Sequence, residues 1–268
     1  MESAIMNGSM MLKPYYETPL GKLYHGDCLE IMPQLEPVDM VLTDPPYGTT
    51  VCKWDAIIPI YPMWEKIFQL IKPNKPIFLF GDEPFASYLR ISNIEQYRYD
   101  WIWYKSKSGN VFQYKNSPMK RHEPIMVFHE GGIAANCYTE YNPKMKKCNK
   151  KVFSQMTNKN NMQGMKSPIR HPKPYIMLKT GYPESVLRFA FSGKRFHPTQ
   201  KPVQLIMYFI ETYTKENEII LDFAIGSGTT AIACERLKRK WIGIEIEEKY
   251  CEIAAKRIEQ ERKQLKLF

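Results

Sequence analysis

The sequence lacks the features that mark membrane, secreted and zinc-binding chains. In its 268 residues no run approaches the roughly 18 uninterrupted apolar residues of a membrane helix. The amino-terminal stretch also lacks the basic-then-apolar pattern of a secretory signal. The six cysteines form no C-x-x-C pair, so we expect no metal site and reduced thiols. We find no internal repeat, and we expect a cytoplasmic globular chain with no membrane partner.

Acidic residues are outnumbered by basic ones, 28 to 38, which gives a net charge of +10. An excess of positive charge favours polyanionic partners, although a basic surface without such a partner is the alternative. Between Lys105 and Lys179 the basic residues are interleaved with Tyr, Phe, Asn and Gln, a mixture that suits phosphate contacts, stacking and base readout. We therefore predict contacts to a nucleic acid from Lys107, Lys120, Arg121, Lys144, Lys146 and Lys147.

Short apolar runs alternate with helical patterns along most of the chain. Strands are expected at 38–43, 76–80, 99–103, 125–128, 219–221 and 240–244, and helices at 63–71, 203–213, 229–237 and 248–263. This alternation predicts an α/β fold with a doubly wound, mostly parallel sheet and ligands at the carboxyl ends of its strands.

The regular pattern fails between residues 131 and 192, where Gly, Pro, Asn and Lys dominate. We predict that 131–192 is an inserted recognition region. The chain then divides into a first half of one domain (11–130), the insertion, the second half of the same domain (193–263) and a tail (264–268).

A glycine turn follows the strand expected at 219–221. Gly226 and Gly228 permit positive φ and a close approach of a ligand to the backbone. Glu245 lies 17 residues beyond Gly228 at the end of the next strand, where a carboxylate can accept hydrogen bonds from a ribose diol. The alternatives are a tight β–α turn with a surface glutamate, or a dinucleotide site.

Asp44-Pro45-Pro46-Tyr47 follows the first buried strand. The amino nitrogen of adenine or cytosine is a poor nucleophile, because its lone pair is delocalised into the ring. Two acceptors for its N–H bonds would activate it, and Asp44 and the carbonyl of Pro45, held by two prolines, can supply them. Tyr47 offers a stacking face worth roughly 1–3 kcal/mol. The alternative is a Pro-Pro turn with an aspartate cap, but together the two motifs suggest methyl transfer to a base amino group.

A target base inside a duplex must be extruded before it can react. The loop 48–55 follows the aspartate–proline turn and carries Trp54, which we predict to fill the gap or hold the opened strand. An ordinary core position for Trp54 is an equal alternative.

Two further segments, His25-Gly26-Asp27-Cys28-Leu29 and His197-Pro198-Thr199-Gln200-Lys201-Pro202, complete a resemblance. With the motifs above, they resemble the β group of amino-group DNA methyltransferases, in which the catalytic motif precedes the cofactor motif. The resemblance implies a Rossmann-like methyltransferase fold, S-adenosylmethionine as cofactor, double-stranded DNA as substrate and a homodimer.

The resemblance also implies roles for single residues. Asp27 would bind the cofactor adenine, with Cys28 contributing backbone, and Glu245 would bind the ribose. Thr199 and Lys201 would hold the methionine moiety, and Asp222 would face the cofactor amino group.

The aspartate of Asp44-Pro45-Pro46-Tyr47 bears on the base. In the family D-P-P-Y is usual for adenine enzymes and S-P-P-Y for cytosine enzymes, so N6-adenine is favoured and N4-cytosine is the alternative. Methylation of RNA or a protein amide, and non-enzymatic DNA binding, are further alternatives. One departure is that Asp222-Phe223-Ala224-Ile225-Gly226 stands where the family commonly has Asp-Pro-Phe-x-Gly.

The chain ends in a short motif, Gln264-Leu265-Lys266-Leu267-Phe268. It resembles the peptide that bacterial sliding clamps bind through a glutamine and a terminal Leu-Phe pair. A helix tail packed on the protein body is the alternative.

Overall fold

The computed structural model describes residues 12–49, 55–109, 114–130, 140–152, 175–191 and 193–265, with backbone alone for 146–152 and 175–179. Trp54, Leu267 and Phe268, which carry predictions, lie outside the described residues. The chain forms two compact units, one of residues up to 142 and from 185 onward, the other of residues 143–184.

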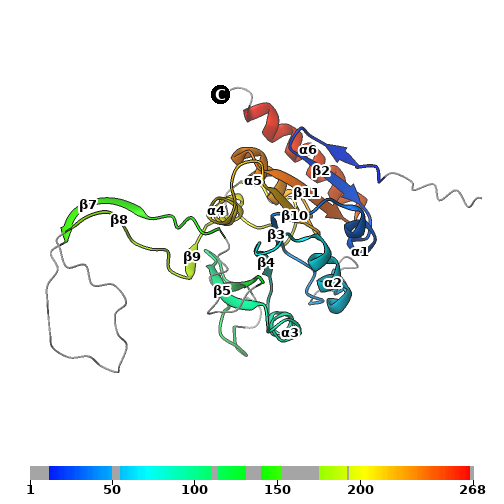
Figure 1. Cartoon of the computed structure of the whole chain (residues 1–268). Helices are drawn as coiled ribbons and strands as arrows, with labels where there is room; N and C mark the ends of the chain where they lie inside the picture. The colour runs from blue at the N-terminus through cyan, green and yellow to red at the C-terminus, as the bar shows by residue number, and fades with distance from the viewer. Residues whose placement is uncertain are drawn as a thin grey trace, which may run out of the picture. The chain divides into compact units, whose positions relative to one another are not determined.

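The larger unit is built on a nine-stranded mixed sheet with the order β1-β2-β11-β10-β3-β4-β6-β5-β9 (Figure 1). The strands are β1 (Tyr16–Glu17), β2 (Gly21–His25), β3 (Met40–Thr43), β4 (Ile77–Phe80), β5 (Tyr97–Tyr104), β6 (His122–Phe128), β9 (Val186–Arg188), β10 (Ile219–Asp222) and β11 (Lys240–Glu245). From β2 through β11, β10 and β3 to β4 every pair is parallel. Strand β6 is antiparallel to β4 and β5, and β1 is antiparallel to β2.

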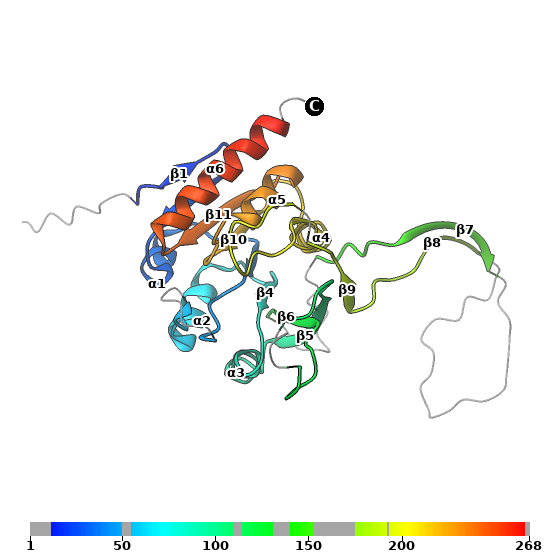
Figure 2. The ribbon, with the colours of Figure 1, turned by 180° about the vertical axis from the view of Figure 1, so that it is seen from behind.

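Helices cover both faces of this sheet (Figure 2). One face packs against α1 (Cys28–Ile31), α2 (Ile60–Leu70) and α3 (Phe85–Ser92), and the other against α4 (Val203–Tyr213), α5 (Thr229–Leu237) and α6 (Glu248–Leu265). A short 3-10 turn, η1 (Met32–Gln34), follows α1. Because strand side chains alternate, Met40 and Leu42 of β3 join the core under α4–α6, whereas Val41 joins the core under α1–α3. The predicted doubly wound α/β fold is confirmed.

For the later elements, the bounds predicted from the apolar pattern agree closely with those of the structure. Helices α4 and α5 have the predicted bounds, and β10 and β11 each extend one residue beyond the prediction, to Asp222 and Glu245. The sequence did not predict β1, β2, α1 or α3; β1 and α1 have only two and four residues, and β2 contains Lys22 and His25 and so lacks a continuous apolar run.

The smaller unit contains a hairpin in which β7 (Lys146–Val152) pairs antiparallel with β8 (Tyr175–Thr180). Its residues, 143–184, are fewer than the predicted insertion of 131–192. The difference arises partly from β9, which falls inside the predicted insertion but pairs in parallel with β5 of the main sheet.

Within the described ranges, none of the helices combines the length and apolar character that a membrane crossing requires.

Candidate active site

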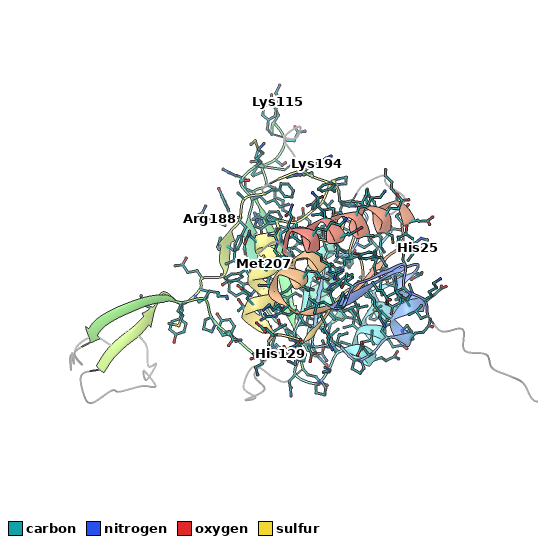
Figure 3. All side chains as sticks on the ribbon, turned by 90° about the horizontal axis from the view of Figure 1, so that it is seen from above. His25, Lys115, His129, Arg188, Lys194 and Met207 are labelled. Atoms are coloured by element: carbon teal, nitrogen blue, oxygen red, sulfur yellow. The ribbon has the colours of Figure 1, made fainter. Side chains whose placement is uncertain are left out.

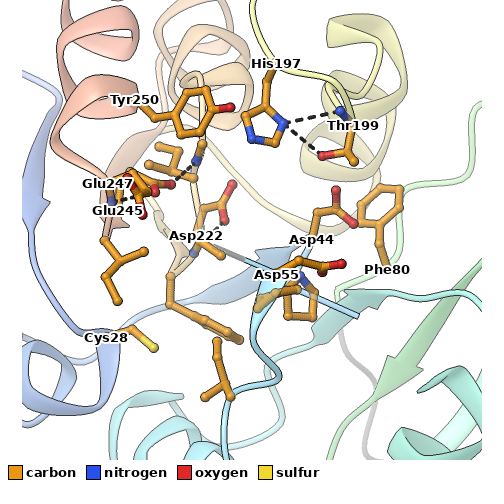
Figure 4. Close-up of a pocket in the computed structure, with 18 of the residues that line it drawn as sticks. Cys28, Asp44, Asp55, Phe80, His197, Thr199, Asp222, Glu245, Glu247 and Tyr250 are labelled. Atoms are coloured by element: carbon orange, nitrogen blue, oxygen red, sulfur yellow. Dashed lines mark hydrogen bonds between the residues drawn. The ribbon is translucent and has the colours of Figure 1, made fainter. Parts of the chain in front are cut away.

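A cavity of about 350 Å³ opens at the carboxyl ends of the neighbouring parallel strands β2, β11, β10, β3 and β4 of the larger unit. Strands β11, β10 and β3 end at Glu245, Asp222 and Thr43, and the chain continues from Thr43 into Asp44. Figure 4 shows Asp222 between Glu245 on one side and Asp44 on the other. The cavity therefore joins the predicted cofactor residues to the aspartate–proline turn, at the edge where open α/β sheets bind ligands.

The glycine turn needs both of its glycines, for different reasons. Gly226 has φ 54° and Gly228 has φ 82°, in the left-handed region that side chains disfavour. A Cβ on Gly226 would meet only His197 within 4 Å, at 3.9 Å, so this backbone borders open space. A Cβ on Gly228 would lie 3.0 Å from Ala254, so this glycine lets α5 pack closely on α6.

Glu245 is buried and is oriented by backbone donors. Its carboxylate accepts hydrogen bonds from the N–H of Gly226 at 2.8 Å and from that of Glu247 at 2.9 Å. Burial raises the pKa of Glu245, and these hydrogen bonds oppose the rise. The predicted ribose acceptor thus lines the cavity in a fixed orientation.

Asp222 is buried among neutral donors. Its carboxylate accepts hydrogen bonds from the hydroxyls of Thr43 at 2.9 Å and Thr230 at 2.5 Å, and from the N–H of Ala224 at 3.3 Å. Burial raises the pKa of Asp222 to about 7. The Thr43 hydroxyl also accepts the N–H of Phe223 at 3.0 Å, and so ties the end of β3 to the end of β10.

The departure in the cofactor motif is accommodated by packing. Phe223 joins the core under α1–α3, and Ile225 joins the core under α4–α6. A Cβ on Gly243 would lie 2.4 Å from Ile225, so Gly243 makes room for that side chain. Both apolar side chains of the turn are largely buried, 2% and 5% exposed for Phe223 and Ile225.

Asp27 and Cys28 lie at the start of α1 and line the cavity. Asp27 is the N-cap residue, and its side chain accepts the N–H of Leu29 at 2.8 Å. Cys28 is buried, and burial raises the pKa of its thiol to about 12, so it is a neutral part of the wall.

At the other end of the cavity, both carboxylate oxygens of Asp44 are occupied. The Tyr47 hydroxyl donates a short hydrogen bond to Oδ1, and the Lys201 ammonium lies 2.7 Å from Oδ2. Burial raises the pKa of Asp44, and Lys201 acts in the opposite direction. The Tyr47 ring stacks on Phe85 of α3 with a centroid distance of 5.4 Å.

Asp55, which the sequence did not single out, fixes the turn after Pro46. Its carboxylate accepts three backbone N–H groups, from Tyr47 at 2.9 Å, Gly48 at 3.1 Å and Thr49 at 2.9 Å. The only signal for it was an aspartate a few residues beyond the turn, and this residue type often bonds to local backbone.

Lys201 has partners that the sequence did not foresee. Its ammonium is buried and lies 2.7 Å from both Asp44 and Glu123 of β6. Glu123 also pairs with Lys105, at 2.5 Å, and these ammonium groups lower its pKa against the effect of burial. The predicted contact of Lys201 with the methionine moiety stays a prediction.

His197, Thr199 and Tyr250 form another part of the wall. The His197 ring packs against Tyr250 with centroids 4.3 Å apart, and its Nδ1 accepts the N–H of Thr199 at 3.3 Å. Burial and the nearby Lys201 lower the pKa of His197 to about 4, so it is neutral at pH 7. Thr199 was predicted to line the site, whereas His197 and Tyr250 had no assigned role.

The predicted DNA-contact residues differ in their surroundings. Lys107 and Lys144 are exposed, Lys120 forms an ion pair with Asp82, and Arg121 lies 5.0 Å from the Tyr104 ring centroid. Lys146 and Lys147 lie on β7, where the backbone alone is described. Contacts of these residues with DNA stay predictions.

Together, the fold and the site define the class: a Rossmann-like methyltransferase fold with a cavity between a glycine turn and a rigid carboxylate turn. The DNA methylase family (N6_N4_Mtase) matches residues 38–256, and the chain belongs to this family.

Named relatives agree with this assignment. The type II methyltransferase M.BamHI of Bacillus amyloliquefaciens is 26% identical over 98% of this chain, which spans 62% of the length of that relative. The type II methyltransferase M2.DpnII of Streptococcus pneumoniae is 25% identical over 95% of both chains.

Solved structures share the fold. The M1.HpyAVI–SAM complex superposes with a TM-score of 0.58 at 25% identity, covering 89% of this chain and all of that one (100%). The cytosine-N4-specific PvuII DNA methyltransferase has a TM-score of 0.61 at 18% identity, covering 91% of this chain and 88% of that one.

Proposed function

We propose that this protein is a DNA methyltransferase that transfers a methyl group from S-adenosylmethionine to the N6 amino group of adenine. The observation that carries the proposal is the single cavity that joins Glu245 and Asp222 to Asp44-Pro45-Pro46-Tyr47. The names of the type II methyltransferase relatives and the cofactor in the M1.HpyAVI complex support it.

The cavity fits the cofactor. Gly226 borders open space without a side chain, and Glu245 offers an oriented carboxylate for a ribose diol. Asp27 would bind the adenine of the cofactor, Asp222 would face its amino group, and Thr199 would hold its methionine moiety. When bound, S-adenosylmethionine supplies an electrophilic methyl group on a sulfonium sulfur.

The aspartate–proline turn would activate the target nitrogen. Asp44 would accept one amino N–H and the Pro45 carbonyl the other, which frees the nitrogen lone pair from the ring and aims it at the methyl group. Tyr47, held against Phe85, would stack on the flipped base. No strong base is needed, because the amino proton becomes acidic once the methyl group is attached.

One assay decides whether adenine or cytosine is the methylated base. We expect nucleoside mass spectrometry of unmethylated duplex DNA, incubated with the protein and S-adenosylmethionine, to find N6-methyladenine. N4-methylcytosine would preserve the mechanism and overturn the base. No methylated nucleoside, at low salt and across varied sequences, would overturn the proposal as a whole.

The DNA surface would lie on the side that carries basic residues. Figure 3 shows Lys115, Arg188 and Lys194 on one side of the larger unit, opposite His129. Arg188 lies 4.4 Å from the Tyr104 ring centroid, and Arg121 lies 5.0 Å from it. Stacked guanidinium groups are well placed for phosphates, so Arg188→Gln and Arg121→Gln should weaken DNA binding and reduce its salt dependence. If the salt dependence of DNA binding is unchanged in both variants, the DNA-binding surface lies elsewhere on the protein.

Trp54 remains our candidate for holding the opened duplex. Trp54→Ala should lower the methylation rate on duplex DNA more than on single-stranded DNA, since only the duplex must be opened. Equal effects on both substrates would remove this role.

We also propose a homodimer. On α2 and α3, Tyr61, Tyr88 and Ile91 are exposed by 77%, 63% and 74%, and exposed apolar patches often mark interfaces. Sedimentation should show a dimer that Ile91→Lys weakens; a wild-type monomer at micromolar concentration would contradict it.

Binding of a sliding clamp is a separate proposal. Leu265 ends α6 and is 41% exposed, and Gln264 is also exposed. A peptide of the last ten residues should bind purified clamp, and the same peptide with alanine at its terminal leucine and phenylalanine should not. No binding of the unaltered peptide would dispose of the proposal.

A further inference from the structure

The carboxylate that should receive the base amino group already has two donors. The Tyr47 hydroxyl donates to one oxygen of Asp44, and the Lys201 ammonium lies 2.7 Å from the other. An incoming N–H bond needs one of these oxygens. A base that enters the site therefore competes with Tyr47 and Lys201 for the lone pairs of Asp44.

A displaced donor in a buried site needs a new acceptor, because a buried polar group without a partner is destabilising. Both donors already lie near the same second acceptor. Oε1 of Glu123 is 3.3 Å from the Tyr47 hydroxyl and 2.7 Å from the Lys201 ammonium. Neither donor has to move far to exchange Asp44 for Glu123.

Glu123 is itself fixed in place. It lies on β6 opposite Trp103 of β5, is 4% exposed, and its other oxygen lies 2.5 Å from the Lys105 ammonium. Within this cluster two carboxylates, Asp44 and Glu123, face two ammonium groups, Lys105 and Lys201. The cluster is neutral, so an exchange of hydrogen bonds inside it transfers no net charge.

We propose that Glu123 is a positioning residue that takes over the hydrogen bonds of Tyr47 and Lys201 when a base amino group replaces them on Asp44. The inference rests on the proposed function and deepens it. It assigns a role in the same reaction to Glu123, which lies outside the aspartate–proline motif on an antiparallel strand. No proton is transferred in the exchange: Asp44 and Glu123 remain carboxylates, and Lys201 remains an ammonium.

The charged and titratable groups around this exchange come from several elements. Lys201, Glu123 and Tyr47 influence the pKa of Asp44, and the charge of Asp44 contributes to the raised pKa of Asp222. The charge of Lys201 acts to lower the pKa of His197, and that of Lys105 acts to lower the pKa of Glu123. The charge of Glu123 in turn acts to raise the pKa of Lys120. Among these, Glu123 is the neighbouring anion that raises the pKa of Asp44.

Glu123→Gln tests the proposal with little change of shape. The amide is neutral and a poorer acceptor, so Lys201 should remain on Asp44. We expect kcat/KM for duplex DNA to fall roughly tenfold to a hundredfold, with unchanged affinity for S-adenosylmethionine. The acid limb of the pH profile of kcat/KM should move to lower pH, because loss of the neighbouring anion lets Asp44 stay ionised in more acidic solution.

Two variants serve as controls, and thermal melting with cofactor titration shows that each is folded. Glu123→Asp retains the charge, so its acid limb should stay at the wild-type position. Glu235→Gln neutralises another buried glutamate, bound to Thr18 and Trp241 away from the cavity, and should keep the wild-type rate.

Wild-type kcat/KM in Glu123→Gln would overturn the proposal. So would a lower kcat/KM with an unmoved acid limb, which is the result expected if Glu123 only supports packing. Failure of the proposed function would show separately, as wild-type protein that forms no methylated nucleoside, and the exchange at Asp44 would fail with it.

Discussion

The two ends of the cavity hold their carboxylates in different ways. At the proposed cofactor end, Asp222 and Glu245 receive neutral donors, namely threonine hydroxyls and backbone N–H groups. At the proposed target end, Asp44 and Glu123 receive the lysine ammonium groups of Lys201 and Lys105. Neutral donors orient a carboxylate without supplying a counter-charge, whereas lysines keep it ionised in a buried setting. The first arrangement suits recognition of a ligand, and the second suits a site whose hydrogen bonds must rearrange during a reaction.

The largest expected effect separates the two ends by function. Asp44→Ala removes an acceptor needed at the reacting nitrogen, so the rate of methylated nucleoside formation should fall roughly 10²- to 10³-fold or more. Calorimetry should find wild-type affinity for S-adenosylmethionine, because the residues expected to bind it lie at the other end. A rate within tenfold of wild type would show that Asp44 does not act on the target.

The next prediction removes the shared lysine. Lys201→Met removes the ammonium that half-buried Asp44 and buried Glu123 share, and Lys105 remains on Glu123 alone, so the free energy of unfolding at neutral pH should fall by about 3–5 kcal/mol. The variant's carboxylates should then have raised folded-state pKa values, and its stability deficit should shrink as the pH is lowered and one of them binds a proton.

Chemical denaturation across pH measures this deficit. Lys256→Met is the matched control, because Lys256 pairs with Glu252 on the surface, where both side chains are more than half exposed, at 77% and 58%. Its stability should change little at any pH. Equal losses in the two variants would contradict the role given to Lys201.

At the cofactor end, Asp222 should leave a signature in the pH dependence of stability. Its folded-state pKa of about 7 lies above its ordinary value of 3.8, so the folded state binds the proton more tightly than the unfolded state. Stability from this group is therefore present at low pH and is lost as the pH rises from 3.8 to about 7, by at most about 1.4 kcal/mol per pH unit.

Asp222→Asn should remove that slope. The free energy of unfolding of the variant, minus that of the wild type, should rise between pH 4 and pH 7 in urea titrations. Parallel curves for the two proteins would mean that Asp222 does not titrate in this range.

The smallest predicted effect concerns the support of the target end. Asp55→Ala removes the acceptor for three backbone N–H groups of the Tyr47 turn, which should cost about 1–3 kcal/mol of stability. Methylation should slow roughly tenfold, because the turn loses its fixed position. Asp55→Asn retains one oxygen and should recover part of the rate. Equal methylation rates for the alanine and asparagine variants would contradict the positioning role proposed for the Asp55 carboxylate.

The sequence predicted the parts of the fold and site that depend on local patterns. Helices α4 and α5 follow from apolar spacing, and the glycine turn and Asp44-Pro45-Pro46-Tyr47 are contiguous motifs beside apolar runs. Strand β1 has only two residues, and α3 has eight and follows Pro84, so neither leaves a strong period.

Residues that act through distant pairing were not predictable. Glu123 reaches Asp44 only because β6 pairs with β4, and nothing near it in the sequence marks that register. Lys201 stands in a recognised motif, but its choice of two carboxylates depends on the same pairing. Asp55 is separated from its turn by a loop whose length alone did not indicate a return to Tyr47.

The most direct test of the proposed methyl transfer follows the methyl group itself. Duplex DNA free of methylation would be incubated with the protein and S-adenosylmethionine carrying a trideuteriomethyl group, and its nucleosides would be analysed by mass spectrometry. We expect N6-methyladenine bearing the deuterium label with wild-type protein and at least roughly a hundredfold slower formation of it with Asp44→Ala. Labelled product at equal yield from both proteins, or no labelled nucleoside from the wild type, would contradict it.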